Sequence, residues 1–283
     1  MNRAILREAC LYGARLQFTT LQGADLRGAD LRRVDLHTAD LRQAYYDRGT
    51  RFPAGFDPDG AGLYGVLPSA QLIGANLRQL DISGAELTAS DLSGACLVEG
   101  RGLGSWLVNV NFSRADLSQA NLSYARLDGA RLDQASLWAT DLSYANLHKA
   151  TLLDTNLEST ILHHTQLNQA VCNAQTLWPQ DFDWRAAGDQ WLGTNASLRG
   201  SDQSHLCLMG VDLSHANLVG ANLQGTDLWG ANLSGADLRD ANLTNANLIA
   251  ATLGGADLTR ADLTHATLPV ESLAALVAEG VVL

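Results

Sequence analysis

Residues 211–268 read VDLSH ANLVG ANLQG TDLWG ANLSG ADLRD ANLTN ANLIA ATLGG ADLTR ADLTH ATL. Written in fives, this stretch places a leucine at every fifth position from Leu213 to Leu268, twelve in succession. An alanine, threonine or valine stands two residues before each leucine, and the residue between them is in most repeats Asp or Asn. A period of five is therefore the property that any fold of this segment has to satisfy.

Neither a helix nor a single strand can bury this pattern. On an α-helix, the rotation of about 100° per residue would spread leucines five apart around the axis. On a flat strand, the side-chain period of two would place successive leucines on opposite faces. A solenoid in which each pentapeptide forms one side and one turn buries all of them, because the small residue and the leucine both point inward. Asp, Asn, Gly, Ser and Thr then take the outer positions, where they suit tight or left-handed turns.

The pattern closely resembles the pentapeptide-repeat family, whose signature is (A/S/T/V)-(D/N)-(L/F)-x-x. The resemblance covers nearly the whole chain. It implies an all-β fold, a right-handed quadrilateral parallel β-helix with four repeats and twenty residues in each coil.

Interruptions of the repeat divide the chain of 283 residues into segments of one continuous solenoid domain. The segment 1–10 fits either the first coil or a short helix that covers it, and the sequence does not separate these. The predicted segments are array one (1–46), an insertion (47–71), array two (72–177), a second insertion (178–197), array three (198–268) and a C-terminal cap (269–283).

The two insertions share a motif, T-x-(F/W)-P-x-x-F-D, whose copies begin at Thr50 and Thr176, 126 residues apart. The segment resembles an element of cyanobacterial pentapeptide-repeat proteins. Proline fixes a turn and the aromatic residues need a surface to pack on, so we expect a corner or a protruding flap docked on the side of the solenoid. The sequence leaves two roles open for the insertions, a structural interruption of the repeat or a docking surface for a partner. The insertion residues concerned are Phe52, Pro53, Phe56, Asp57, Trp178, Pro179, Phe182 and Asp183.

The segment 269–283 has the features of a short capping helix. Pro269 suits the first turn, Glu271 suits the positive end of the helix, and Gly280 suits the C-terminal cap. A solenoid end exposes an unpaired edge, so a covering helix is expected there. The apolar tail leaves homodimerisation through this end open.

Composition excludes several classes of protein. The net charge of −11 argues against direct nucleic-acid binding, which needs a basic surface. The four cysteines lie far apart without metal-ligand spacing, and Cys172 falls at a leucine position, where we expect it to be buried. The opening MNRAILREAC lacks the apolar core of a secretory signal, and no stretch is apolar for long enough to span a membrane. These features predict a cytoplasmic protein without a cofactor or metal.

No catalytic constellation is evident in the sequence. The GRGLGS segment around Gly102 lacks the strand and helix that a nucleotide loop needs, so a bulge or a narrowed side is expected there. An enzymatic function would require a buried polar cavity near Gly102 or near Gln203, the off-pattern residue of array three. All seven histidines fall at outward positions: His37, His148, His163, His164, His205, His215 and His265.

Two sets of apolar or aromatic residues recur every twenty positions and should form columns on the outside. Met209, Trp229 and Ile249 make one column, and Tyr124, Tyr144 and His164 make the other. A column of stacked side chains can stabilise a β-helix, and an exposed apolar column can also be the core of an interface. Both roles are open, so these six residues are the candidate partner surface.

Two functions are compatible with these features. The first is a non-enzymatic regulatory or protein–protein interaction scaffold that presents a long surface to an unknown partner, as the family resemblance implies. The alternative is an acidic mimic of DNA that binds DNA gyrase, as in the fluoroquinolone-resistance members of the family. One continuous acidic face would favour the mimic, and a mixed charge distribution would weaken it.

Overall fold

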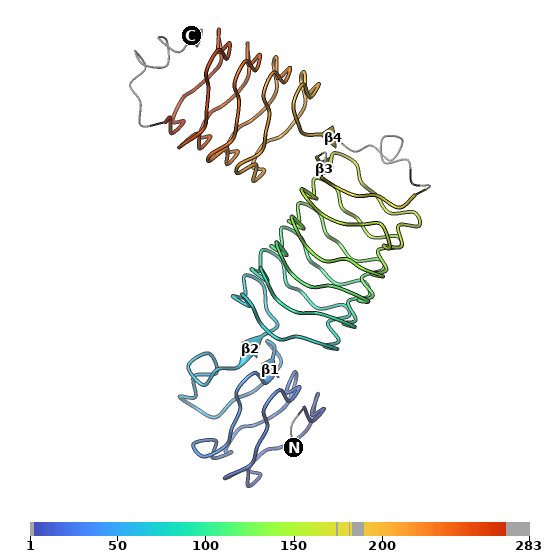
Figure 1. Cartoon of the computed structure of the whole chain (residues 1–283). Helices are drawn as coiled ribbons and strands as arrows, with labels where there is room; N and C mark the ends of the chain where they lie inside the picture. Colours follow the sequence, from blue (N-terminus) through green and yellow to red (C-terminus); the bar gives the residue numbers. More distant parts are fainter. Residues whose placement is uncertain (1–2, 174, 181, 183–189, 270–283) are drawn as a thin grey trace. The chain divides into compact units, whose positions relative to one another are not determined.

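The computed structural model describes residues 3–173, 175–180, 182 and 190–269. The pentapeptide repeats among these residues form a four-sided parallel β-helix. Bridges join residues twenty apart, for example Asp91 with Asn111 and Asn222 with Asn242, so four pentapeptides complete one coil. Figure 1 shows these coils stacked on one another within array two, drawn in green. The predicted period of the coil is confirmed.

Each side of a coil is so short that pairing is limited to a single residue in most repeats. Longer pairing occurs at the insertions, where β1 (Tyr45–Tyr46) pairs with β2 (Tyr64–Gly65) and β3 (Val171–Cys172) pairs with β4 (Gln190–Trp191). Both pairs are parallel, and each joins residues nineteen apart, as in Tyr45 with Tyr64. The two insertions therefore close their coils with the same register.

The turn between sides depends on one residue in the left-handed region. The second residue after most core leucines has φ near +60°, and glycine fills only some of these positions. Tyr144 (φ 59°), Ala250 (φ 57°) and Gly230 (φ 67°) are examples. The backbone N–H three residues after the leucine donates to the leucine carbonyl, as Ala251 does to Leu248 at 3.0 Å. Each corner is thus a β-turn with a positive φ at its third residue.

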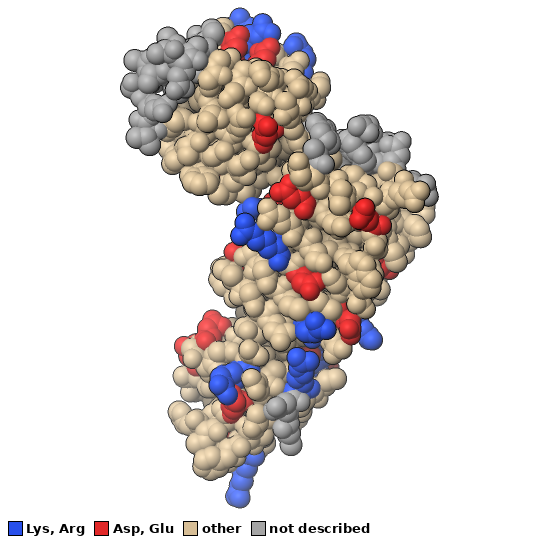
Figure 2. Space-filling view, in the orientation of Figure 1, with Lys and Arg blue, Asp and Glu red and all other residues tan. Residues whose placement is uncertain are grey.

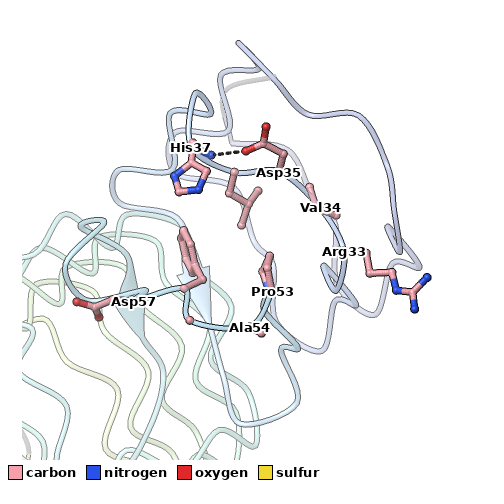
Figure 3. Close-up of a pocket in the computed structure, with 10 residues that line it drawn as sticks. Arg33, Val34, Asp35, His37, Pro53, Ala54 and Asp57 are labelled. Carbon is pink, nitrogen blue, oxygen red and sulfur yellow. Dashed lines mark hydrogen bonds between the residues drawn. The ribbon is translucent and has the colours of Figure 1, made fainter.

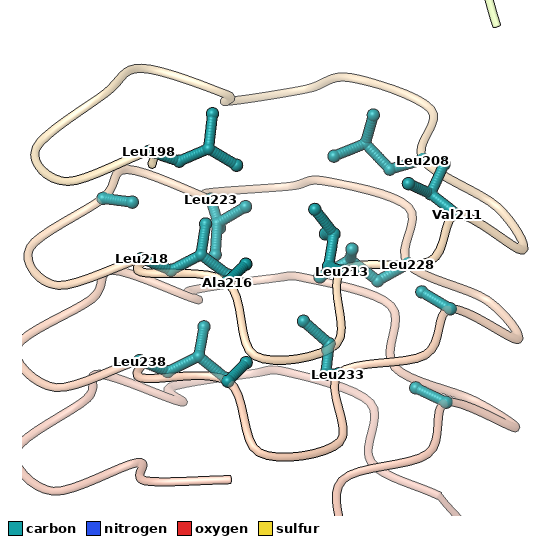
Figure 4. Close-up of a cluster of buried hydrophobic side chains, with 14 of the residues drawn as sticks. Leu198, Leu208, Val211, Leu213, Ala216, Leu218, Leu223, Leu228, Leu233 and Leu238 are labelled. Atoms are coloured by element: carbon teal, nitrogen blue, oxygen red, sulfur yellow. The ribbon is translucent and has the colours of Figure 1, made fainter. Parts of the chain in front are cut away.

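The core consists of the inward leucines and small residues. Ten of the twelve regularly spaced leucines from Leu213 to Leu268 are buried, and the last two, Leu263 and Leu268, are partly buried at the end of the array. Figure 4 shows Leu198, Leu218 and Leu238 stacked above one another inside the coil. Polar residues at inward positions bond the backbone, since Thr226 Oγ1 donates to Gln203 O at 2.8 Å. The predicted burial of Cys172 is confirmed.

The chain divides into two compact units. The first comprises residues 1–146 and 159–165, and the second comprises residues 147–158 and 166–283. Within the first unit, the coil that starts array two at Gln71 and Asn76 bridges only to the coil after it, through Asp91 and Cys96. Among the described residues, the backbone ladder is therefore interrupted after β2.

The fold tests two local expectations, the start of the first coil and the bulge at Gly102, and leaves the C-terminal helix untested. Ile5 and Cys10 bridge Asp25 and Asp30, so the chain from residue 3 to residue 10 belongs to the first coil and is not a helix. The helix expected over 269–283 falls on residues 270–283, which lie outside the described residues.

The ladder also continues through Gly102 without a bulge, since Arg101 bridges both Asp81 and Asn121. A Cβ added at Gly102 would lie 2.7 Å from Leu122 Cδ2 and 3.2 Å from Ser105 Oγ. The bulge alternative was wrong because the ladder keeps its twenty-residue register through Arg101, and the close contacts around Gly102 agree with the alternative of a narrowed side.

The left-handed turn predicts opposite effects for two neighbouring substitutions. Ala250→Gly should stabilise the protein by about 0.5–1 kcal/mol, because the left-handed penalty of roughly 1–2 kcal/mol exceeds the entropy cost of glycine. Ala251→Gly, at the buried inward position, should destabilise it by about 1–2 kcal/mol. Thermal and denaturant unfolding of both variants checks the signs, and destabilisation by Ala250→Gly would contradict this account of the corner.

The repeat architecture also predicts that core damage stays local. Leu233→Asp places a charge without a partner in the core of array three, which should cost more than about 4 kcal/mol. Because coils depend on their neighbours, hydrogen exchange should accelerate in the second unit and stay slow in the first. Ser234→Asp, one residue further on at an outward position, is the control and should leave exchange unchanged.

Candidate interaction surface

Met209, Trp229 and Ile249 form an exposed apolar column on array three, named here the apolar strip. Their side chains are 46%, 47% and 37% exposed, although each residue directly follows a buried leucine. The backbone joins the three coils, because Gly210 N–H donates to Trp229 O and Gly230 N–H donates to Ile249 O, both at 2.9 Å. The strip therefore combines fixed spacing with open apolar surface, as expected of an interface core.

The turn positions next to the apolar strip carry almost no side chain. Gly210, Gly230 and Ala250 follow its three members, and a Cβ added at either glycine would meet no atom within 4 Å. Asp227 precedes Trp229 by two residues and accepts the Trp229 N–H at 3.2 Å, which holds the corner that presents the indole. Within the described part of the chain, Gly210 and Gly230 therefore leave room at this corner for an approaching partner surface.

The second predicted column is a ring stack on the first unit. The Tyr124 and Tyr144 rings are 4.8 Å apart with an interplanar angle of 5°, and the Tyr144 and His164 rings are 4.9 Å apart. The three residues have φ values of 59°, 59° and 54°, so each occupies a strained turn position. Ring stacking contributes about 0.5–1.5 kcal/mol per pair, comparable to that strain. The stacking covers the ring faces that meet within the column, and Tyr124 and Tyr144 are still 56% and 48% exposed.

At the start of each insertion, a threonine hydroxyl makes two hydrogen bonds to the backbone, an arrangement named here the clamp. The comparison of the two insertion sequences did not predict it. Thr50 Oγ1 accepts the Asp47 N–H at 3.1 Å and donates to Leu26 O at 3.0 Å. Thr176 does the same with the Asn173 N–H at 3.1 Å and with Leu152 O at 2.7 Å. The signal that could have found this clamp is the 126-residue spacing, because Asp47 and Asn173 match one another three positions before the threonines.

The aromatic residues of the first insertion pack on the core of array one. Phe52 and Phe56 stack at 5.1 Å, and Tyr46 meets Phe52 edge-on at 5.6 Å. Both phenylalanines contact the buried cluster that includes Leu31 and Leu41. They therefore extend the core, and are not docked only on the side of the solenoid.

A hollow lies where the loop of the first insertion passes array one. It encloses about 520 Å³ and is lined by the backbone and side chains of residues 33–37 and 53–57. Figure 3 shows Asp35 and His37 across from Pro53 and Ala54, with Arg33 pointing away.

In the second insertion Trp178 and Phe182 stack at 5.4 Å, matching Phe52 and Phe56, while Asp183 lies outside the described residues.

Side chains connect the arrays where the ladder is interrupted. In the first unit, Arg7 Nη2 donates to Asp81 O at 2.6 Å and Tyr45 Oη donates to Asn76 O at 3.1 Å, so both cap carbonyls of the first array-two coil. In the second unit, Lys149 Nζ lies 2.6 Å from Asp202 Oδ2. The hydrogen bond from Lys149 keeps the pKa of Asp202 below its usual value.

Many acidic side chains are paired with arginine, so the negative charge is dispersed. Hydrogen bonds from Arg32 and Arg42 lower the pKa values of Asp30 and Asp40 to about 2, although both carboxylates are on the surface. Arg27 and Asp25 form a pair that is almost completely buried. Burial raises the pKa of Asp25, and the hydrogen bond from Arg7 opposes that rise. Figure 2 shows basic and acidic residues interspersed on a mostly uncharged surface.

The described part of the chain offers no evident metal or membrane-spanning element. Within it, no group of three His, Cys, Asp or Glu residues is placed to hold a metal ion. Among the same residues there is also no helix with the length and apolar character that crossing a bilayer requires. Of the predicted outward histidines, His148 is partly buried and the other six are exposed.

Comparison with known sequences identifies the family. Eight copies of the family pattern described as Pentapeptide repeats match residues 2–45, 69–99, 104–134, 135–171, 207–245, 216–255 and 241–269. The chain belongs to the pentapeptide-repeat family. Members of this family fold as right-handed quadrilateral β-helices, which agrees with the four-sided coil. No curated protein matches the chain.

Several solved pentapeptide-repeat structures resemble this one. HetL, from the cyanobacterium Nostoc sp. strain PCC 7120 and involved in heterocyst differentiation regulation, is 25% identical, with 96% of this chain and 92% of HetL covered and a TM-score of 0.28. A second Nostoc protein is 36% identical over 44% of this chain and 81% of its own, with a TM-score of 0.29. QnrB1, a plasmid-mediated fluoroquinolone resistance protein, is 14% identical, with 100% and 98% covered and a TM-score of 0.26.

The clamp in the first insertion yields a prediction about stability. Thr50→Val removes the hydroxyl that donates to Leu26 O and accepts the Asp47 N–H, and Leu26 O keeps only its bond from the Ala29 N–H. The loss of these two hydrogen bonds should cost about 1–3 kcal/mol of unfolding free energy. Thr50→Ser retains the hydroxyl and should cost less than half as much. Asp47→Asn should be nearly neutral, because Asn173 occupies the same position in the second clamp. Denaturant unfolding of the three variants tests this order.

Proposed function

We propose that this pentapeptide-repeat protein is a non-enzymatic scaffold of the cytoplasm that binds a protein partner through the apolar strip. The observation that supports this proposal is the exposure of Met209, Trp229 and Ile249 at one corner of a solenoid whose core is otherwise complete. An indole that is 47% exposed leaves a substantial apolar area in water, and its burial by a partner would recover that cost.

Catalysis is not part of this proposal. The core is filled with leucine and small residues, and the space beside Gly102 is occupied by Leu122 and Ser105. A catalytic site would need convergent polar groups in a cavity. The hollow of the first insertion offers Asp35 and His37, but the contact between them is a turn bond from the His37 backbone N–H to Asp35 Oδ1 at 3.1 Å.

The charge distribution argues against the alternative of a gyrase-binding DNA mimic. Such a protein would present a continuous acidic face, whereas Asp30, Asp40 and Asp237 are each bonded to the arginine two residues further on. The face in Figure 2 also carries both signs of charge. We therefore favour the scaffold.

Site-specific crosslinking tests the scaffold proposal. A photoreactive benzoylphenylalanine at position 229 should form one discrete adduct when the protein is irradiated in an extract of its native cell. The same residue at position 239, which is exposed half a coil from the strip column, is the control and should not form that adduct. Mass spectrometry of the adduct identifies the partner.

Two results would contradict the proposal. Identical adducts from positions 229 and 239 would show that contact is not specific to the strip, and the absence of any adduct from position 229 would remove the proposed site. If the adduct contains a gyrase subunit, and the protein also inhibits DNA supercoiling by gyrase, the alternative function replaces the scaffold.

A further inference from the structure

The electrostatic surroundings of the apolar strip restrict the kind of partner that it can bind. The three arginines of array three are Arg199, Arg239 and Arg260. By the twenty-residue register, they lie at the corner half a coil away from Trp229, which is the diagonally opposite corner of the four-sided coil. Array three contains no lysine. The positive charges of the array are therefore far from the strip.

The two faces that meet at the strip carry acidic residues instead. Asp227 lies on one face, two residues before Trp229, and Asp212 lies on the other, three residues after Met209. Among the described residues, neither aspartate takes part in an ion pair, whereas Asp237 and Asp240 at the opposite corner each pair with an arginine. The strip is thus an apolar column between two uncompensated negative charges.

Both aspartates are held in place by the neighbouring coil. Asp212 Oδ1 accepts the Ser214 N–H at 3.0 Å and an N–H of the Asn232 side chain, also at 3.0 Å. Asp227 Oδ1 accepts an N–H of the Asn247 side chain at 2.9 Å. In both residues these bonds use Oδ1, and Asp212 Oδ2 also accepts a hydrogen bond from Thr194 Oγ1 at 3.1 Å. All of these donors are neutral, so the negative charge of each carboxylate is left without a compensating cation.

The spacing of the strip indicates the secondary structure of the partner. Successive coils are separated by about 4.8 Å, and the ring stack of the first unit shows the same spacing, 4.8 Å between the Tyr124 and Tyr144 centroids. Residues on one face of an α-helix are about 5–6 Å apart when they are three or four positions apart. Residues on one face of a strand are about 6.6 Å apart. The side-chain spacing along one face of a helix is therefore closer to the spacing of the strip than the side-chain spacing along one face of a strand.

We propose that the apolar strip binds a basic amphipathic helix of a partner protein, with apolar residues of the helix on Met209, Trp229 and Ile249 and with Lys or Arg residues beside Asp212 and Asp227. This inference rests on the proposed function and specifies the chemistry of the partner. The column of Gly210, Gly230 and Ala250 gives the helix room to approach closely. Binding by an amphipathic helix through residues at i, i+3 or i+4, and i+7 is a common mode of recognition.

The direct test uses two labelled peptides of eighteen residues with the same leucine spacing, one with lysine and one with glutamate on the polar face. Fluorescence anisotropy with the full-length protein should show binding of the leucine–lysine peptide and at least about tenfold weaker binding of the leucine–glutamate peptide. Trp229→Asp should abolish binding of the leucine–lysine peptide. Raising the salt concentration to 0.5 M should weaken it, since screening shortens the range of the charges.

A charge-matched control separates the site from the overall charge of −11. Asp212→Asn with Asp227→Asn should weaken binding about three- to tenfold. Asparagine already occupies the equivalent positions 232 and 247, so the fold should tolerate both changes. Asp257→Asn with Asp262→Asn removes the same charge on the faces next to the arginine corner, and should leave affinity unchanged because those faces lie away from the strip. The fold should tolerate these changes as well, since Asn217 and Asn242 stand at the equivalent positions.

The outcomes distinguish this inference from the scaffold proposal. Equal affinity for the two peptides, equal effects of the two double variants, or no binding of either peptide would overturn the basic helix as the partner. Crosslinking at position 229 would still decide separately whether the strip binds a protein. Binding of the leucine–lysine peptide that survives Trp229→Asp would place the contact elsewhere and overturn the inference as well.

Discussion

The backbone ladder between successive coils is the interaction on which the rest of the structure depends. A leucine N–H donates to the carbonyl of the coil that follows, as Leu213 does to Asn232 at 2.7 Å, and the N–H of Asn232 returns a bond to Val211 at 2.9 Å. These bonds fix the coil at twenty residues and place equivalent side chains above one another. The inward pair of each repeat then forms a continuous core, and the outward residues form columns.

The same ladder requires strained corners. In this coil the turn from one side to the next within two residues uses a positive φ, and Gln79, Tyr124 and Asn245 occupy such positions without being glycine. The solenoid tolerates this cost because each corner adds a buried leucine, which contributes about 1.5–3 kcal/mol. Where the ladder is interrupted, side chains replace it. Arg7 and Tyr45 donate to carbonyls of the first array-two coil, which a preceding coil would bond in an uninterrupted ladder.

The period of five was sufficient to predict a solenoid, the inward leucines and the burial of Cys172, because burying a regular apolar pattern leaves few geometries, and the family resemblance added the four-sided coil of twenty residues. The interactions around the insertions could not be predicted in the same way. The clamp at Asp47 and Thr50 depends on a carbonyl 24 residues before the threonine, and the contact from Arg7 to Asp81 spans 74 residues outside the repeat register. A bulge or a narrowed side was expected at Gly102 because glycine often marks such positions, and the intact ladder on both sides of that residue contradicts the bulge.

The composition of the surface is independent of the core, and for that reason the family fold does not determine the partner. Trp229 and Gly230 occupy a corner whose equivalents elsewhere are pairs such as Ser143 and Tyr144, while the leucine before each pair is buried in the same way. Three substitutions spaced twenty residues apart therefore create a closely spaced column and leave the packing of the core unchanged. A local charge pattern can be placed beside such a column by exchanging Asp for Asn, since both residues make the same turn bond. The total charge of −11 accordingly says little about recognition, whereas the positions of Asp212 and Asp227 relative to Trp229 restrict it.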